Sequence, residues 1–271
     1  MLSPPKRSET KLNTLDRDLP EGLLVDAAWL AKRGFSTSLR SQYVAAGRLE
    51  QPARRVYRRP RGSISWREAV ISLQMMLGYP LVVGGRTALE LHGFAHYLTS
   101  DVREVHLYGP KPPPTWLRTL PLAERFVYHS DGRLFRADSA KPKAGKNPDA
   151  LARAAFAVQR WGQWDWPMAL SDPARAILEL LDELPNHETF EQADKFMQGL
   201  TNLSLRRLQA LLVECDNVKV KRLFFFFADR HSHAWLKHLN RNAIDLGTGK
   251  RMLVKDSPPF SKRYLRRLGK G

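Results

Sequence analysis

The stretch that decides the fold of the N-terminal part is GLLVDAAWLAKRGFSTSLRSQYVAAGRLEQPARRVYRRPRG, residues 22–62. Ala27 and Leu30 recur at helical spacing after Asp26, a residue type that caps helix N-termini. Gly34 permits the left-handed backbone conformation that commonly ends a helix. The pattern therefore predicts a first short helix that begins after Asp26 and ends at Gly34.

A second helix is predicted only three residues later. Ser36 is its candidate N-cap, Leu39, Tyr43 and Ala46 line one face, and Gly47 closes it. The opposite face carries hydroxyl, amide and guanidinium groups, on Thr37, Ser38, Arg40, Ser41 and Gln42. Such groups contact base edges and phosphates when a helix lies in the major groove, so the pair of helices is typical of a helix-turn-helix motif.

Two short extended pieces follow the second helix, at residues 48–49 and 56–57, and predict a small hairpin around residues 51–55. Five arginines lie on or beside its loop: Arg54, Arg55, Arg58, Arg59 and Arg61. A loop at this place would contact the DNA backbone or the minor groove. The order helix, turn, helix, wing predicts a winged helix-turn-helix DNA-binding domain over residues 1–62, in which residues 1–11 form a loose arm.

The distribution of charge supports a polyanionic partner. The 271-residue chain has a net charge of +17, and residues 1–63 carry 13 Lys and Arg against 6 Asp and Glu. Residues 250–271 carry 8 against 1, whereas residues 146–249 carry 13 against 13. Because the excess positive charge is concentrated at the two ends of the chain, we expect these ends to bind duplex DNA and the middle of the chain to have a different role.

Several other classes of protein are disfavoured. The single cysteine, Cys215, excludes an internal disulfide and a cysteine metal cluster. The histidine pairs, at 92 and 96 and at 231 and 233, lack a third ligand, so we expect no metal and no cofactor. The N-terminus lacks the apolar core of a secretory signal, and no stretch of about 18 apolar residues could cross a membrane. We therefore expect a cytoplasmic protein with no membrane partner.

The remainder predicts a larger second domain, residues 63–271, and an overall α+β fold class. It comprises a small mixed α/β sheet (63–169), a helical bundle (170–249) and a basic tail (250–271). Hairpins are expected over residues 125–135, closed at Asp131 and Gly132, and over residues 156–168. Asp172 followed by Pro173 is a strong helix start, and helices are predicted from there onward.

The most enzyme-like stretch is a strand followed by Gly84 and Gly85 and a helix start, a pattern that can hold phosphate on backbone N–H groups. A nucleotidyltransferase would then need paired carboxylates for metal. Asp101 stands at the corresponding place, but Arg103 replaces the second acid. Close packing of strand and helix is therefore the favoured interpretation, with a nucleotidyltransferase-like enzyme as the alternative. An RNA-binding module is a third hypothesis.

Five motifs, in this order, resemble the AbiEi family of antitoxins of type IV toxin–antitoxin systems. They are GRLEQPARRVYRRP, VVGGRTALELHGF, SDPARAILELLDELP, FMQGLTNLSLRRLQALLVECDNVKVKRLFFFFAD and DLGTGKRMLV. The resemblance covers residues 12–264 and implies a non-enzymatic winged-helix autorepressor that binds repeated sequences in its own promoter. It further implies a C-terminal domain needed for antitoxin action against a nucleotidyltransferase toxin encoded alongside, without a stable complex being required.

Two features depart from the family pattern. The family wing commonly carries glycine before the Val-Tyr pair, where this chain has Arg55, so a different wing turn is expected. The tail is also more basic than the family pattern. From its charge alone we expect a second DNA contact by Lys262, Arg263, Arg266 and Arg267.

Overall fold

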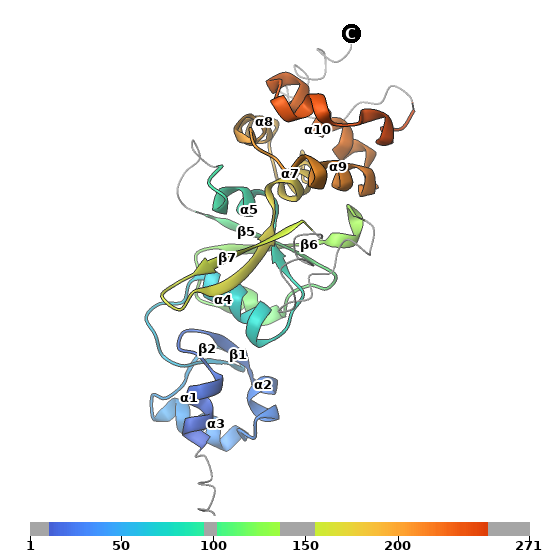
Figure 1. Cartoon of the computed structure of the whole chain (residues 1–271). Coiled ribbons are helices and arrows are strands. Elements are labelled where there is room, and N and C mark those ends of the chain that lie inside the picture. Colours follow the sequence, from blue (N-terminus) through green and yellow to red (C-terminus); the bar gives the residue numbers. More distant parts are fainter. Residues whose placement is uncertain (1–10, 95–101, 136–154, 249–271) are drawn as a thin grey trace, which may run out of the picture. The chain divides into compact units, whose positions relative to one another are not determined.

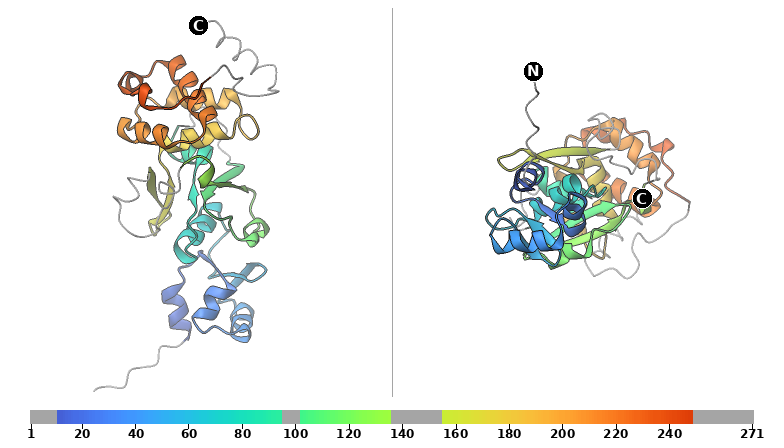
Figure 2. Two further views of the ribbon diagram at one scale, coloured as in Figure 1. Left: turned by 90° about the vertical axis from the view of Figure 1, so that its right-hand side faces the viewer. Right: turned by 90° about the horizontal axis from the view of Figure 1, so that it is seen from below.

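The computed structural model describes residues 11–94, 102–135 and 155–248, and the described chain forms two compact units (Figures 1 and 2). The first unit comprises Met1–Tyr79, Pro113–Arg125 and Arg160–Met168. The second comprises Pro80–Pro112, Phe126–Gln159 and Ala169–Gly271. Each unit is described by itself below.

The first unit begins with the predicted winged helix. Its helices are α1 (Lys11–Asp18), α2 (Ala27–Lys32) and α3 (Thr37–Ala45). Its antiparallel sheet has the strand order β1-β3-β2, with β1 at Leu24–Asp26, β2 at Glu50–Ala53 and β3 at Val56–Arg58. Strand β1 was not predicted, and β2 begins after residue 49 rather than at residue 48.

Local signals set the ends of these helices. Asp26 accepts a hydrogen bond from Trp29 N (2.7 Å), and Ser36 accepts one from Leu39 N (3.2 Å), so both predicted N-caps are confirmed. Gly34 and Gly47 adopt positive φ angles of 79° and 65° just beyond the two helices. The helices pack on the sheet around a core of Leu15, Leu19, Val25, Leu30, Phe35, Leu49 and Tyr57.

The first compact unit extends beyond the expected boundary at residue 62. Helix α4 (Trp66–Ile71) begins with a capping box formed by Ser65 and Glu68, and it continues as a π-helical turn at Ser72–Met76. Ser72 Oγ accepts a hydrogen bond from Leu24 N in β1 at 2.8 Å. Because this buried bond ties the π-helical turn to the sheet of the winged helix, α4 belongs to the same compact unit.

A second sheet has five strands in the order β6-β5-β4-β8-β7, most of whose residues belong to the second unit. Its strands are β4 (Val82–Val83), β5 (Glu104–Gly109), β6 (Arg125–Ser130), β7 (Phe156–Trp161) and β8 (Trp166–Ser171). Strand β4 pairs antiparallel with β5 and parallel with β8. The hairpin predicted at Asp131 and Gly132 is wrong, since those residues form a 3-10 turn and Phe135 bridges to Cys215 instead.

Helices cover this sheet and form the C-terminal bundle: α5 (Gly85–Leu91), α7 (Pro173–Asp182), α8 (Phe190–Gly199), α9 (Leu205–Glu214) and α10 (Val218–His231). Asp172 caps α7 as predicted by accepting from Arg175 N at 2.9 Å. Helix α7 lies at the centre, in contact with α5, α8, α9 and α10 (Figure 1). None of the described helices is long and apolar enough to span a bilayer.

Candidate nucleic-acid interface

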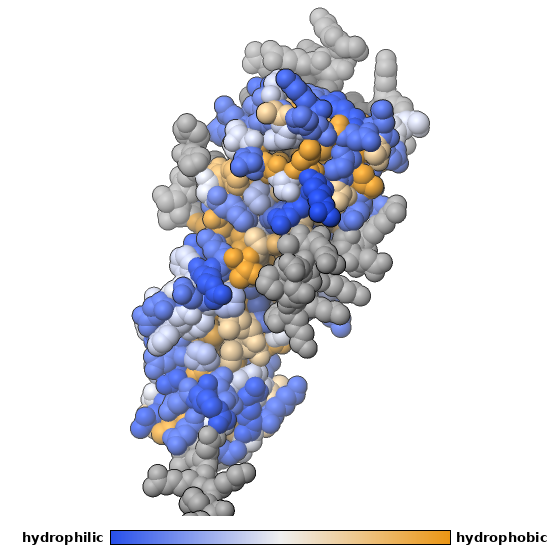
Figure 3. Space-filling view, in the orientation of Figure 1, coloured by the Kyte–Doolittle hydropathy of each residue, from blue (hydrophilic) through white to orange (hydrophobic). Residues whose placement is uncertain are grey.

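Helix α3 presents a strip of small polar side chains to solvent. The exposed residues of this strip are Thr37, Ser38, Ser41, Gln42 and Ala45. At 3.6 residues per turn they fall within an arc of about 140° of the helix surface. The opposite side of the helix packs on the core through Leu39 and Tyr43. The surface over the N-terminal elements is accordingly mostly hydrophilic (Figure 3).

Arg40 does not belong to this strip, and the expectation that it lies on the exposed face is wrong. Its side chain is buried, with a relative exposure of 8%. Its guanidinium donates to Ala27 O (2.9 Å) and to Thr37 Oγ1 (2.8 Å) and lies over the Tyr57 ring. Arg40 therefore ties α3 to the start of α2 and positions the Thr37 hydroxyl. The sequence could not reveal this role, because the acceptor on Ala27 is supplied by the tertiary fold.

The wing is a tight hairpin whose turn consists of Arg54 and Arg55, and both side chains are exposed. Arg55 adopts φ = 64°, the left-handed conformation that normally favours glycine. Ala27 N donates to Arg55 O at 2.9 Å, which holds the turn against the start of α2. Arg55 thus takes the left-handed conformation that a glycine at this position would favour, and it adds a positive charge at the tip of the wing.

The other three wing arginines are turned inward, so the expectation that they are available at the surface is wrong for Arg58 and only partly met for Arg59 and Arg61. Arg58 is 5% exposed and pairs with Glu50 at 2.6 Å, the residue opposite it in the β2–β3 register. Arg59 pairs with Asp16 and Glu21, each at 3.1 Å. Arg61 is half-buried over the Trp166 ring. These three arginines therefore stabilise the wing through ion pairs and a ring contact.

After the carboxylates of the winged helix have been paired, several of its positively charged side chains remain exposed. Its five carboxylates within residues 11–62 are all engaged: Asp26 caps α2, and ion pairs hold Asp16, Asp18, Glu21 and Glu50. Among the described residues no carboxylate contacts four exposed cations, Lys32, Arg48, Arg54 and Arg55. Two of these, Lys32 and Arg48, were not among the predicted contacts. The tail cations Lys262, Arg263, Arg266 and Arg267 lie outside the described residues.

The alternative site at Gly84 and Gly85 is occupied by a side chain of the protein itself. Glu179 of α7 accepts a hydrogen bond from Gly85 N at 2.9 Å, and a Cβ atom at Gly84 would collide with the Glu179 carboxylate and the Tyr108 ring. Glu179 also accepts from Arg175 Nε (2.7 Å). The two glycines thus allow close packing, the interpretation favoured from the sequence, but the group packed against them is a buried ion pair on α7 that the sequence did not predict. Asp101 lies outside the described residues.

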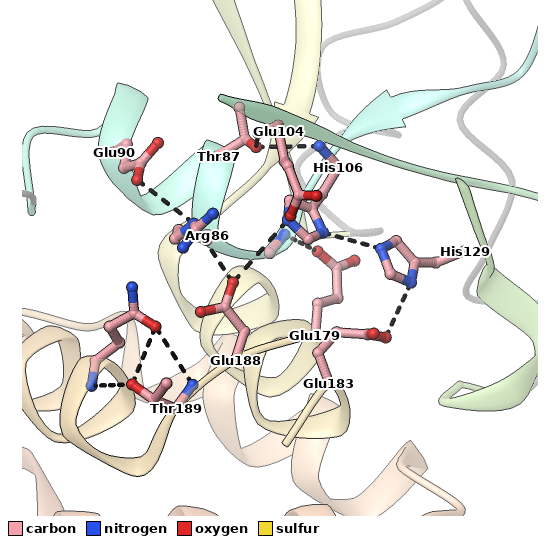
Figure 4. Close-up of polar contacts among 12 residues, drawn as sticks. Arg86, Thr87, Glu90, Glu104, His106, His129, Glu179, Glu183, Glu188 and Thr189 are labelled. Atoms are coloured by element: carbon pink, nitrogen blue, oxygen red, sulfur yellow. Dashed lines mark hydrogen bonds and ion pairs between the residues drawn. The ribbon is translucent and has the colours of Figure 1, made fainter. Parts of the chain in front are cut away.

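Beside this turn lies a network of buried polar side chains, which runs from Glu183, just after α7, through His129 of β6 and His106 of β5 to Glu188 and Arg86 (Figure 4). Glu183 contacts His129 Nδ1 at 2.9 Å, and His129 Nε2 lies 2.9 Å from His106 Nδ1. If the protons are assigned from the carboxylate outward, His129 donates to Glu183 and His106 donates to His129. The unprotonated Nε2 of His106 then faces Glu188 Oε1 at 4.0 Å, and Arg86 Nε lies 3.4 Å from the same oxygen.

Burial determines which of these buried side chains are protonated in the folded state. It raises the pKa of Glu188 to about 7, with Arg86 opposing the rise, and it lowers the pKa of His106 to about 3, with the neighbouring His129 lowering it further. Burial also raises the pKa of Glu183, but the hydrogen bond from His129 and the attraction of the nearby imidazoles more than offset this, leaving the pKa of Glu183 below its ordinary value. No group of three or more metal-ligating side chains occurs within the described ranges.

Replacement of Glu188 by glutamine should change how stability depends on pH. The folded-state pKa of Glu188 is raised from 4.5 to about 7, so the folded state holds a proton that the unfolded state releases. Its contribution to stability is present below pH 4.5 and is lost as the pH rises to 7, at about 1.4 kcal/mol per pH unit. The free energy of unfolding of Glu188→Gln minus that of the wild type should therefore increase across this interval in urea titrations. Parallel curves, as expected for the exposed control Glu191→Gln, would contradict the assignment.

The chain matches two protein-family models and resembles a solved structure in fold. A family model described as "Transcriptional regulator, AbiEi antitoxin, Type IV TA system" matches residues 102–265. A model of the AbiEi antitoxin N-terminal domain matches residues 8–100. Among solved structures, the RV2827C protein from Mycobacterium tuberculosis is similar in fold, with a TM-score of 0.52 and 15% identity over 96% of this chain and 93% of that one. No curated protein matched the chain.

Proposed function

Because this chain belongs to the AbiEi family of transcriptional regulators, the antitoxins of type IV toxin–antitoxin systems, we propose that it binds duplex DNA in its own promoter. In this proposal α3 lies in the major groove and the Arg54–Arg55 turn contacts the adjacent backbone or minor groove. Occupation of the promoter represses the operon that encodes the protein.

The observation that carries this proposal is the division of charge within the winged helix. The carboxylates of residues 11–62 form a helix cap or ion pairs. Four cations, in contrast, are exposed and contact no carboxylate among the described residues: Lys32, Arg48, Arg54 and Arg55. Phosphate contacts supply most of the sequence-independent affinity for DNA, and exposed cations of this kind provide them. The basic tail, with Lys262, Arg263, Arg266 and Arg267, would add a second backbone contact.

The antitoxin role concerns a second activity of the same chain. We expect the protein to counteract a nucleotidyltransferase toxin encoded beside it, with the second unit carrying this action. Growth of cells that express the toxin should be restored by the wild-type protein, and also by a variant that lacks the wing arginines, because the two activities use different units. Loss of rescue in that variant would contradict the separation.

The DNA proposal is tested by fluorescence anisotropy with three nucleic acids of equal length: the upstream region of the gene, a duplex of the same composition in scrambled order, and a structured RNA. The upstream region should bind most tightly, and its affinity should fall steeply as salt increases. Equal affinity for both duplexes would remove sequence-specific repression, and preference for the RNA would favour an RNA-binding module instead.

A further inference from the structure

The exposed strip of α3 has an unusual composition for a recognition helix. It offers hydroxyl groups, one amide and one methyl group, on Thr37, Ser38, Ser41, Gln42 and Ala45. No arginine, lysine or carboxylate side chain of α3 is exposed, because Arg40, its single charged residue, is buried and donates to Ala27 O and Thr37 Oγ1. The groups that could contact bases are therefore few and chemically narrow.

Each base pair presents a distinct pattern in the major groove. Guanine is most often recognised by a bidentate arginine or lysine and cytosine by a carboxylate, whereas adenine is recognised by a bidentate amide and the thymine methyl by apolar contact. The strip lacks the first two kinds of side chain. It contains one amide, Gln42, for adenine, and apolar groups, the Thr37 methyl and Ala45, that suit the thymine methyl.

The hydrogen bond from Arg40 fixes the orientation of the Thr37 side chain. Because Arg40 Nη2 donates to Thr37 Oγ1 at 2.8 Å, this hydroxyl already accepts one bond and is oriented to donate its own proton. Thr37 lies at the first position of α3, directly after the Ser36 cap, and recognition helices contact bases through their N-terminal residues. Arg40 is thus a positioning residue that acts through Thr37.

We propose that α3 selects operator sites whose contacted base pairs are A·T-rich, with Gln42 pairing to an adenine and the Thr37 methyl packing on a thymine methyl group. This inference rests on the proposed DNA-binding function and adds the base composition of the site. The exposed cations Lys32, Arg48, Arg54 and Arg55 contribute affinity that does not depend on sequence.

The test is selection from a random duplex library by the full-length protein, followed by sequencing of the bound DNA. The wild type should enrich A·T pairs in the bound sequences, Gln42→Ala should lower the preference for one adenine by roughly tenfold, and Gln42→Arg should convert that position towards guanine. Gln198→Ala, which removes an exposed amide from α8, is the matched control and should leave the selected motif unchanged.

The outcomes separate the inference from the function beneath it. Enrichment of G·C pairs in the selected motif, or a motif that Gln42→Ala and Gln42→Arg leave unaltered, would overturn the base assignment while leaving DNA binding intact. Failure of the wild type to enrich any sequence would instead overturn the proposed repressor function. Gln42 is exposed, so circular dichroism spectra of its variants should match the wild type.

Discussion

Replacement of Glu179 by alanine should lower the free energy of unfolding of the second unit by about 3–5 kcal/mol, the range for breaking a buried ion pair at one partner. Glu179 accepts hydrogen bonds from Arg175 Nε, Ser171 Oγ and Gly85 N at 2.7, 3.0 and 2.9 Å. The alanine variant would deprive a guanidinium that lies between Phe135 and Phe156 of this carboxylate. Urea denaturation followed by circular dichroism measures the loss.

Two companion variants make this prediction specific. Glu179→Gln keeps the shape and the acceptor oxygen, so it should lose less stability than Glu179→Ala. Glu191→Ala breaks the exposed pair with Lys195, for which no more than about 0.5 kcal/mol is expected. A loss below about 1 kcal/mol in Glu179→Ala would mean that the buried network does not hold α5, α7 and β8 together.

Removal of both wing arginines, in the double variant Arg54→Ala and Arg55→Ala, should weaken binding to every duplex by roughly 100-fold. Hydrogen bonds to charged groups contribute about 1.5 kcal/mol or more each, and two such losses correspond to about two decades in Kd. Because each phosphate contact contributes about 0.9 to the slope of log affinity against log salt, the slope should become shallower by about 1.8. Anisotropy titrations between 50 and 200 mM salt, a range within which such contacts weaken strongly, measure both effects.

Charge and backbone conformation can be separated at the wing turn. Arg55→Gly also removes one cation, but glycine tolerates φ = 64° without the cost of about 1–2 kcal/mol that a left-handed conformation imposes on other residues. This variant should therefore bind DNA less tightly yet unfold at a higher temperature. The double variant Arg118→Ala and Arg125→Ala removes two exposed arginines outside the winged helix and should leave affinity unchanged. An equal loss there would show that net charge alone governs binding.

The short-range features of the fold were predictable from the sequence. The caps at Asp26, Ser36 and Asp172 and the helix end at Gly34 are confirmed because each depends on atoms within a few residues along the chain. The charge asymmetry and the winged helix itself follow from the same local patterns. The strands were less predictable: β1 is only three residues long and exists because β3 lies beside it.

The residues of the candidate DNA-binding surface also show which properties the sequence determines and which only the tertiary structure decides. Sequence by itself determined the winged helix, the family and the apolar side of α3 that faces the core, since the spacing of apolar positions decides which side of a helix is buried. Only the tertiary structure decided which cations remain at the surface. An arginine has a long side chain, and whether it is buried depends on acceptors that other elements supply: Glu50 of β2 for Arg58 and Ala27 O of α2 for Arg40. The turn at Gly85 likewise depends on the Glu179 carboxylate, 94 residues away. Such partners meet only after the strands and helices have packed.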